Sequence, residues 1–434
     1  MKQKIYKRKR IIPVGWKEIK LGDVFRTSSG STPLSTEKSY YEGGVIPWIN
    51  SGELASPYIY ETSNYITQKG FENSSTEMYP KDTVLVAMYG ATAGKASLLK
   101  LEACTNQAIC AILPNEGYCP EFIKYNIDTL YEHLVGLSSG SARDNLSQAG
   151  LKELKLVLPK TKKEQEKLVS VLSLLDRKIE LNRQINDNLE AMAKQLYDYW
   201  FVQFDFPNEE GKPYKSSGGT MVYNERLKRE VPIGWEVENL IDFAEIKNGA
   251  TPSTADEANY GGDIVWITPK DLSDQQSKFV YQGERNITKQ GFDSCSTSML
   301  PTNSVLMSSR APIGLVSITK HEVCTNQGFK SFIPKNISDS IYLYYYIKHH
   351  IKQIEQLGTG TTFKEVSRDD LCKFPILTIG AKDIYMQWIE LQNGIADKQL
   401  ALTKEIAALT KQRDELLPLL MNGQIGRASC RERV

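Results

Sequence analysis

Pro13-Val-Gly-Trp16 returns later in the chain as Pro232-Ile-Gly-Trp235, and this recurrence decides the fold. From these two points the sequence matches itself at a nearly constant offset of about 220 residues. A period of this length is too long for a solenoid repeat, so each copy should be a whole domain with its own hydrophobic core. We therefore predict two tandem domains of the same fold.

Four further segments recur in the same order, separated only by small insertions and deletions. They are Ser29-Gly-Ser-Thr-Pro33 with Asn248-Gly-Ala-Thr-Pro252, Tyr41-Glu-Gly-Gly-Val-Ile-Pro-Trp48 with Tyr260-Gly-Gly-Asp-Ile-Val-Trp266, Ile66-Thr-Gln-Lys-Gly-Phe71 with Ile287-Thr-Lys-Gln-Gly-Phe292, and Cys104-Thr-Asn-Gln107 with Cys324-Thr-Asn-Gln327. An ordered set of this kind is far beyond chance, and it fixes the alignment of the two copies.

The composition is that of an ordinary soluble globular protein, with 41% apolar and 24% charged residues among 434. A net charge of +1 neither supports nor excludes nucleic-acid binding, because positive charge can gather on one face. No apolar run is long enough to span a bilayer, and the N-terminus lacks the apolar segment of a secretory signal. These features predict a cytoplasmic protein without membrane contact.

Each copy has the pattern of a mixed α/β (α+β) domain. Short apolar runs such as Val84-Leu-Val86 and Val305-Leu-Met307, bounded by Gly, Pro, Ser and Asn, indicate strands. Residues 122–134 and 341–357 carry the 3.6-residue apolar recurrence of amphipathic helices. We expect strand-rich domains with helices packed on them.

A long heptad pattern follows each copy, and no Gly or Pro interrupts residues 164–200. Two helices with apolar seams in one chain are expected to pair as a coiled coil. The residues predicted to pair them are Leu168, Leu172, Leu175, Ile179, Leu189 and Leu196 in the first helix, and Trp388, Ile395, Leu402, Ile406, Leu409 and Leu416 in the second. Asn182 and Asn186 also fall on the seam, where they either fix the register as buried polar groups or face solvent.

These patterns divide the chain into segments. We expect a first domain at 1–160, a first long helix at 161–203, a linker rich in Gly, Pro, Ser and charge at 204–230, a second domain at 231–380, a second long helix at 381–425, and a non-native tail at 426–434.

The motifs of common enzymes are missing. Gly90-Ala-Thr-Ala-Gly-Lys95 is one residue too short for a phosphate-binding loop and lacks the following Ser or Thr, and the second copy loses the Lys. Seven cysteines without a Cys-x-x-Cys pair, and four histidines without ligands at metal spacing, predict no metal site. No cofactor and no catalytic residue are expected, so the chain is predicted to recognise a partner and not to be an enzyme itself.

Residues that read DNA should lie where the copies diverge inside matched loops, since two readers usually see different sequences. Thr105-Asn-Gln107 is identical in both copies, so its Asn and Gln either read adenine or, as we favour, pin neighbouring loops. The candidate DNA-binding residues are Arg26, Tyr89, Thr92, Lys95, Asn106, Gln107, Ser139, Ser141, Arg143, Lys247, Ser309, Arg310, Asn326, Gln327, Thr359, Thr361, Thr362 and Lys364. Arg26 and Lys247 are expected to anchor phosphates.

The ordered set of Pro-x-Gly-Trp, Gly-x-Thr-Pro, Tyr-x-Gly-Gly and Thr-Asn-Gln, duplicated with two heptad helices, resembles the specificity subunit of type I restriction-modification enzymes. The resemblance runs from about Ile12 to Gln424. It implies two target-recognition domains that each read half of a split target in double-stranded DNA. It further implies that the two helices pack as an antiparallel coiled coil, a spacer that holds the domains apart. It also implies that partner subunits do the chemistry: modification subunits methylate adenine, and restriction subunits translocate and cut DNA.

Two other interpretations stay open at this point. The chain is either the recognition fragment of a fused restriction-methylation enzyme, or a scaffold or adaptor whose paired domains on a coiled coil bind protein or glycan. Salt-dependent binding to duplex DNA separates the reader from the scaffold.

Overall fold

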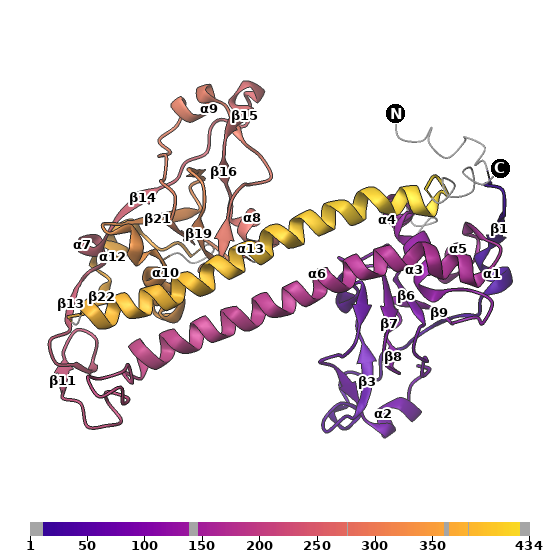
Figure 1. The fold of residues 1–434 in the computed structure, drawn as a ribbon, viewed down its shortest axis with the longest axis horizontal. Helices are drawn as coiled ribbons and strands as arrows, with labels where there is room; N and C mark the ends of the chain where they lie inside the picture. Colours follow the sequence, from indigo (N-terminus) through magenta and orange to yellow (C-terminus); the bar gives the residue numbers. More distant parts are fainter. Residues whose placement is uncertain (1–11, 139–145, 276, 360–363, 381, 426–434) are drawn as a thin grey trace, which may run out of the picture. The chain divides into compact units, whose positions relative to one another are not determined.

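The computed structural model describes residues 12–138, 146–275, 277–359, 364–380 and 382–425 (Figure 1). The chain forms two compact units, of which the first comprises residues 1–183 with 404–434 and the second residues 184–403. Each unit therefore contains one sequence repeat and a part of both long helices. No helix within the described residues is long and apolar enough to cross a membrane.

A five-stranded sheet forms the centre of the first unit. Its order is β2 (Thr27–Ser29), β9 (Ile109–Ile112), β6 (Val84–Ala87), β7 (Ala96–Leu99) and β4 (Tyr58–Ile59). All neighbours are antiparallel except β4 and β7. The central strand β6 and its neighbours β9 and β7 are buried at every position, which explains their largely apolar sequences. Helix α3 (Pro120–Asp128) packs against β6 and β7.

The second unit repeats this sheet. Its order is β14 (Ala244–Asn248), β21 (Phe329–Pro334), β18 (Val305–Ser308), β19 (Val316–Thr319) and β17 (Phe279–Val280). The register is kept as well, since Val84 lies opposite Ile112 in the first sheet and Val305 opposite Phe332 in the second. Helix α10 (Ser340–His349) packs against β18, β19 and β21. The prediction of mixed α/β domains is confirmed.

A two-stranded ribbon joins the beginning of each repeat to its end. In the first unit β1 (Trp16–Lys20) pairs antiparallel with β10 (Lys155–Pro159), and in the second β13 (Glu236–Asn239) pairs antiparallel with β22 (Pro375–Thr378). Pro-x-Gly-Trp sits at the entry of each ribbon, where Gly15 and Gly234 have positive φ values of 85° and 81° that other residues rarely adopt. Each ribbon leads directly into a long helix.

The two long helices are α6 (Lys162–Tyr197) and α13 (Lys382–Met421). In the first unit, Arg413 donates to Asp176 at 3.1 Å and Asn182 donates to Glu405 at 2.9 Å. In the second unit, Gln392 donates to the carbonyl of Ala193 at 2.9 Å. As the residue number rises along α6 it falls along α13, so the helices pair antiparallel.

The segment expected to be a linker, 204–230, is folded. Phe204 and Phe206 are buried, and the ring of Phe206 stacks on Trp235 with the centroids 5.2 Å apart. A hairpin of β11 (Met221–Asn224) and β12 (Arg229–Pro232) follows. The Gly, Pro and Ser content suggested a linker because composition does not reveal that two phenylalanines anchor this segment on the domain core.

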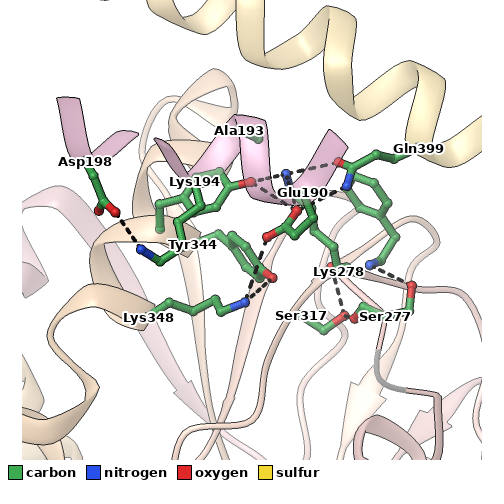
Figure 2. A network of polar contacts seen from close by, with 12 residues as sticks. Glu190, Ala193, Lys194, Asp198, Ser277, Lys278, Ser317, Tyr344, Lys348 and Gln399 are labelled. Atoms are coloured by element: carbon green, nitrogen blue, oxygen red, sulfur yellow. Dashed lines mark hydrogen bonds and ion pairs between the residues drawn. The ribbon is translucent and has the colours of Figure 1, made fainter. Parts of the chain in front are cut away.

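A polar network holds the second repeat to both long helices (Figure 2). Lys278, just before β17, donates to Tyr345 of α10 at 2.7 Å and to Gln399 of α13 at 3.3 Å. Glu190 of α6 lies 3.5 Å from the ammonium group of Lys278 and accepts from Tyr345 at 3.1 Å. Burial lowers the pKa of Lys278 to about 8, although Glu190 acts in the opposite direction.

In the first unit, Tyr125 matches Tyr345 and makes the equivalent hydrogen bond to a carboxylate of α6. Tyr125 of α3 donates to Asp176 of α6 at 2.6 Å, and Arg413 of α13 donates to the same carboxylate. In each unit, therefore, a tyrosine of the domain, a carboxylate of α6 and a polar residue of α13 meet at one place.

Candidate nucleic-acid interface

The recurring Gly-x-Thr-Pro loops close tightly on the recurring Thr-Asn-Gln segments. In the first repeat the N–H of Ser31 donates to the carbonyl of Thr105 at 3.0 Å, and in the second the N–H of Ala250 donates to the carbonyl of Thr325 at 2.9 Å. A Cβ atom on Gly30 would lie 1.9 Å from the carbonyl oxygen of Thr105. Only glycine fits there, which explains why the motif recurs.

The polar side chains of the shared motifs fasten the same loops. Thr32 donates to Gln107 at 2.5 Å, and Thr251 donates to Gln327 at the matched position. The Oδ1 of Asn106 accepts from the N–H of Ala108 at 3.1 Å, and Asn326 accepts from Gly328 in the second repeat. Identical bonding in both repeats favours the structural alternative for Asn106, Gln107, Asn326 and Gln327. Together these loops form a common frame.

The loop after the central strand carries the clearest difference between the repeats. Tyr89, which is 50% exposed, follows β6, and Arg310 follows β18 at the matched position with its side chain 47% exposed. One frame thus presents an aromatic ring and the other a guanidinium group.

Two predicted DNA contacts in the same loops do not reach the surface. Thr92 is buried and donates to the carbonyl of Ser51 at 2.7 Å, while Ser309 is buried and its hydroxyl donates to the carbonyl of Gly328 at 3.2 Å. Their hydroxyl groups stabilise the loops, so this placement does not support base reading. The sequence pattern marks them as divergent and polar but does not show that they point inward.

The basic residues predicted to contact DNA are exposed or half-exposed, and two of them lie beside carboxylates. Arg26 donates to Glu77 at 2.8 Å, and Lys247 lies 2.5 Å from Glu245. Exposed ion pairs of this kind contribute little stability, so a phosphate can replace the carboxylate at small cost. Lys95 is half-buried, whereas Thr359 and Lys364 are exposed. The candidates Ser139, Ser141, Arg143, Thr361 and Thr362 lie outside the described residues.

Sequence reasoning missed a carboxylate and a lysine beside Arg310. Glu365 accepts from the Nε of Arg310 at 3.0 Å and from Lys330 at 3.2 Å. The available signal was Lys330, a charged residue inside the apolar strand β21 where the first repeat has Cys110. Nothing in the sequence linked Glu365 to it.

The residues predicted to pair the helices all lie on the side of α6 and α13 that is turned away from solvent. Three are buried and nine are half-buried: Leu172, Ile179 and Trp388 in the first group, and Leu168, Leu175, Leu189, Leu196, Ile395, Leu402, Ile406, Leu409 and Leu416 in the second. Asn182 is 5% exposed and bonds Glu405, so it is a buried polar residue of the seam.

The described part of the chain holds no metal-binding cluster, and its most buried cysteines are poor nucleophiles. No group of three or more His, Cys, Asp or Glu there could hold a metal ion. Burial raises the pKa of Cys104 to about 11 and that of Cys110 to about 12, which keeps both thiols protonated at neutral pH.

A family model described as "Type I restriction modification DNA specificity domain" matches residues 13–191 and again residues 232–418. The chain belongs to this family. The two matches coincide with the two repeats and the long helix that follows each, so the chain carries two DNA specificity domains. The resemblance inferred from the duplicated motifs is confirmed.

Relatives of this specificity family align over nearly the whole chain. The MjaIX specificity subunit of Methanocaldococcus jannaschii is 28% identical, with 95% of this chain and 94% of the relative covered. The HindI specificity subunit of Haemophilus influenzae is 26% identical, with 94% and 99% covered. A crystal structure of the S subunit of a type I system from M. genitalium shares the fold, with a TM-score of 0.56 and 16% identity over 95% of this chain and 97% of that one.

Proposed function

We propose that the chain is the DNA-recognition subunit of a type I restriction-modification complex and reads a bipartite target, one half with each repeat. The observation that carries the proposal is the common frame, which is built twice from the same bonds and presents Tyr89 in one copy and Arg310 in the other. A shared frame with different exposed side chains is what two readers of different half-sites need.

The chemistry is assigned to partners. Modification subunits would supply the methyl transfer to adenine, and restriction subunits would supply translocation and cleavage, while this chain is not catalytic. The buried, protonated thiols and the missing enzyme motifs support this division. Because its target is the host genome, we place the complex in the cytoplasm.

A second apolar stripe on α6 supports the proposed protein partners. Val171, Leu174, Leu181, Ile185 and Met192 are large apolar residues on this helix, between 39% and 67% exposed. They follow the spacing of three, four and seven that places residues on one helix face, apart from the seam with α13. Exposed apolar faces of this kind mark protein interaction sites, and we assign this one to the modification subunits.

The decisive experiment is to express the chain with its modification subunits and to sequence the methylated adenines in the DNA of the cell. We expect a single split target with two defined half-sites and a constant gap. A control expression without this chain should lose that methylation. Methylation that does not depend on the chain would contradict the assignment.

The scaffold and fusion alternatives are tested separately. Binding of the assembled complex to duplex DNA should weaken steeply with salt, because phosphate contacts release counterions. The absence of DNA binding with all partners present would favour a scaffold or adaptor. Methyl transfer by the purified chain alone would contradict the proposal that it has no catalytic role.

A further inference from the structure

The second repeat contains a group of three charged side chains that the first repeat lacks. Arg310, Glu365 and Lys330 are joined by hydrogen bonds, whereas the first repeat has Tyr89 in place of Arg310 and Cys110 in place of Lys330. The bonds of the Gly-x-Thr-Pro and Thr-Asn-Gln loops, by contrast, are the same in both repeats. We therefore expect these three charged residues to have a function that only the second repeat performs.

The buried charge of Lys330 lowers the stability of the fold, so we expect the group of three charged residues to have a function. Its side chain is 8% exposed on a strand that the first repeat completes with a small apolar thiol. A buried ammonium group without a partner is strongly unfavourable, and the described residue that neutralises it is Glu365. Partial burial acts to raise the pKa of Glu365, but the bonds from Lys330 and Arg310 outweigh it and hold the pKa below its usual value. The carboxylate is therefore charged and fixed at neutral pH.

Glu365 in turn fixes the orientation of Arg310. Its Oε2 accepts from the Nε of Arg310 at 3.0 Å, and the two residues also form a backbone bridge. Among the described residues, the two terminal nitrogens of Arg310 have no hydrogen-bond partner. Glu365 thus holds the guanidinium at Nε, and no described residue bonds its outer edge.

This geometry suits a base better than a phosphate. Two terminal N–H groups in one plane match the O6 and N7 acceptors of guanine in the major groove. Glu365 is fixed beside the guanidinium by Lys330, so it cannot move aside for a phosphate as the exposed Glu77 can beside Arg26, and its charge would repel a phosphate.

We propose that Arg310 reads a guanine in the half-site recognised by the second repeat, with Glu365 as the residue that positions it and Lys330 as the residue that holds Glu365. This inference rests on the proposed function. It adds which base is read, which residue reads that base and which repeat contains the residue.

The test uses the complete complex with its modification subunits and a set of DNA duplexes in which each base pair of the methylated target is replaced in turn. We expect Arg310→Ala to reduce discrimination at one G·C pair of one half-site by about ten-fold to a hundred-fold and to leave the other half-site unchanged. Arg310→Lys, which keeps the charge but loses the planar pair of donors, should not restore it. Equal weakening of every duplex would overturn the inference, because it would identify a phosphate contact.

Two further variants test whether Glu365 positions Arg310. Glu365→Gln should reduce discrimination at the same base pair while binding to mismatched duplexes is kept. Because a buried Lys330 without a charged partner can destabilise the domain, the double variant Lys330→Met with Glu365→Gln removes both charges together and should show the same loss. Full discrimination in this folded double variant would contradict the role of Glu365.

Arg26→Ala is the matched control, since Arg26 is an exposed arginine paired with Glu77 in the first repeat. As a phosphate anchor it should weaken all duplexes alike. If the proposed function itself is wrong, the wild-type complex will discriminate no base pair at all. This outcome differs from a failure of the Arg310 assignment, in which the wild-type complex still discriminates.

Discussion

At the scale of single residues, Lys278 is a buried lysine with several polar and ionisable neighbours. It is buried among elements that contribute Glu190, Tyr344, Tyr345, Lys348 and Gln399 (Figure 2). Because burial lowers the pKa of Lys278 to about 8, the unfolded state binds more protons than the folded state between pH 8 and the ordinary value of 10.5. The free energy of unfolding should therefore rise with pH across this window.

The prediction is tested with Lys278→Met, which should remove this rise. Denaturant titrations of both proteins at several pH values between about 7.5 and 10 give the difference between them, and effects common to both cancel. Lys289→Met, which removes an exposed lysine of the same unit, is the control. Parallel curves for wild type and Lys278→Met would show that Lys278 stays protonated throughout.

Single residues also show where sequence reasoning succeeded and where it stopped. The Gly-x-Thr-Pro and Thr-Asn-Gln motifs were recognisable because they recur, and their identity in both copies favoured the structural role that their bonds now support. Thr92 and Ser309 differ between the repeats, yet both point inward. Divergence alone does not report the direction of a side chain, and Glu365 escaped notice because its partners are distant in sequence.

At the scale of elements, the paired helices carry a layer of polar contacts that can be removed without disturbing its neighbours. Lys178 and Asn182 of α6 contact Glu405 of α13, while Asp176–Arg413 and Glu190–Gln399 lie on either side. Deleting one heptad from each helix, residues 177–183 and 404–410, removes this layer and keeps both seams in phase.

We expect this double deletion to fold and to change the gap between the half-sites. Seven residues correspond to about 10 Å of helix, or roughly three base pairs of rise, with a rotation around the DNA of about a hundred degrees. Sequencing of methylated adenines should show the same half-sites with a different gap, or no methylation at all. An unchanged gap would show that the helices do not set it. A single deletion in α6 alone, which breaks the pairing with α13, is the control for misfolding.

The helices were the elements most predictable from sequence, because a heptad pattern over many turns has few alternative explanations. All twelve residues expected on the seam lie on the protected side of their helices. The segment 204–230 was harder, since its Gly and Pro content suggested a linker. Two buried phenylalanines outweigh that composition by anchoring the segment on the core of the second unit.

At the scale of the whole molecule, the duplicated sequence predicted the mixed α/β fold of both units and their common frame. We expect the two repeats to be separable in function as well. Replacing residues 232–374 with the matching segment of another member of the family should change one half of the methylated target and preserve the other. Methylome sequencing of cells that carry the chimera measures this directly. A change in both halves would contradict the assignment of one half-site to each repeat.

The ribbons β1–β10 and β13–β22 have a consequence for inheritance. Because the first and last strands of each repeat pair with each other, the two junctions at which foreign sequence would enter lie side by side. A recombination event that crosses over within the two short strands would thus deliver an intact domain to an intact host protein. Under the proposed function, a lineage that carries this gene would acquire a new DNA target in one genetic step, without evolving either domain anew.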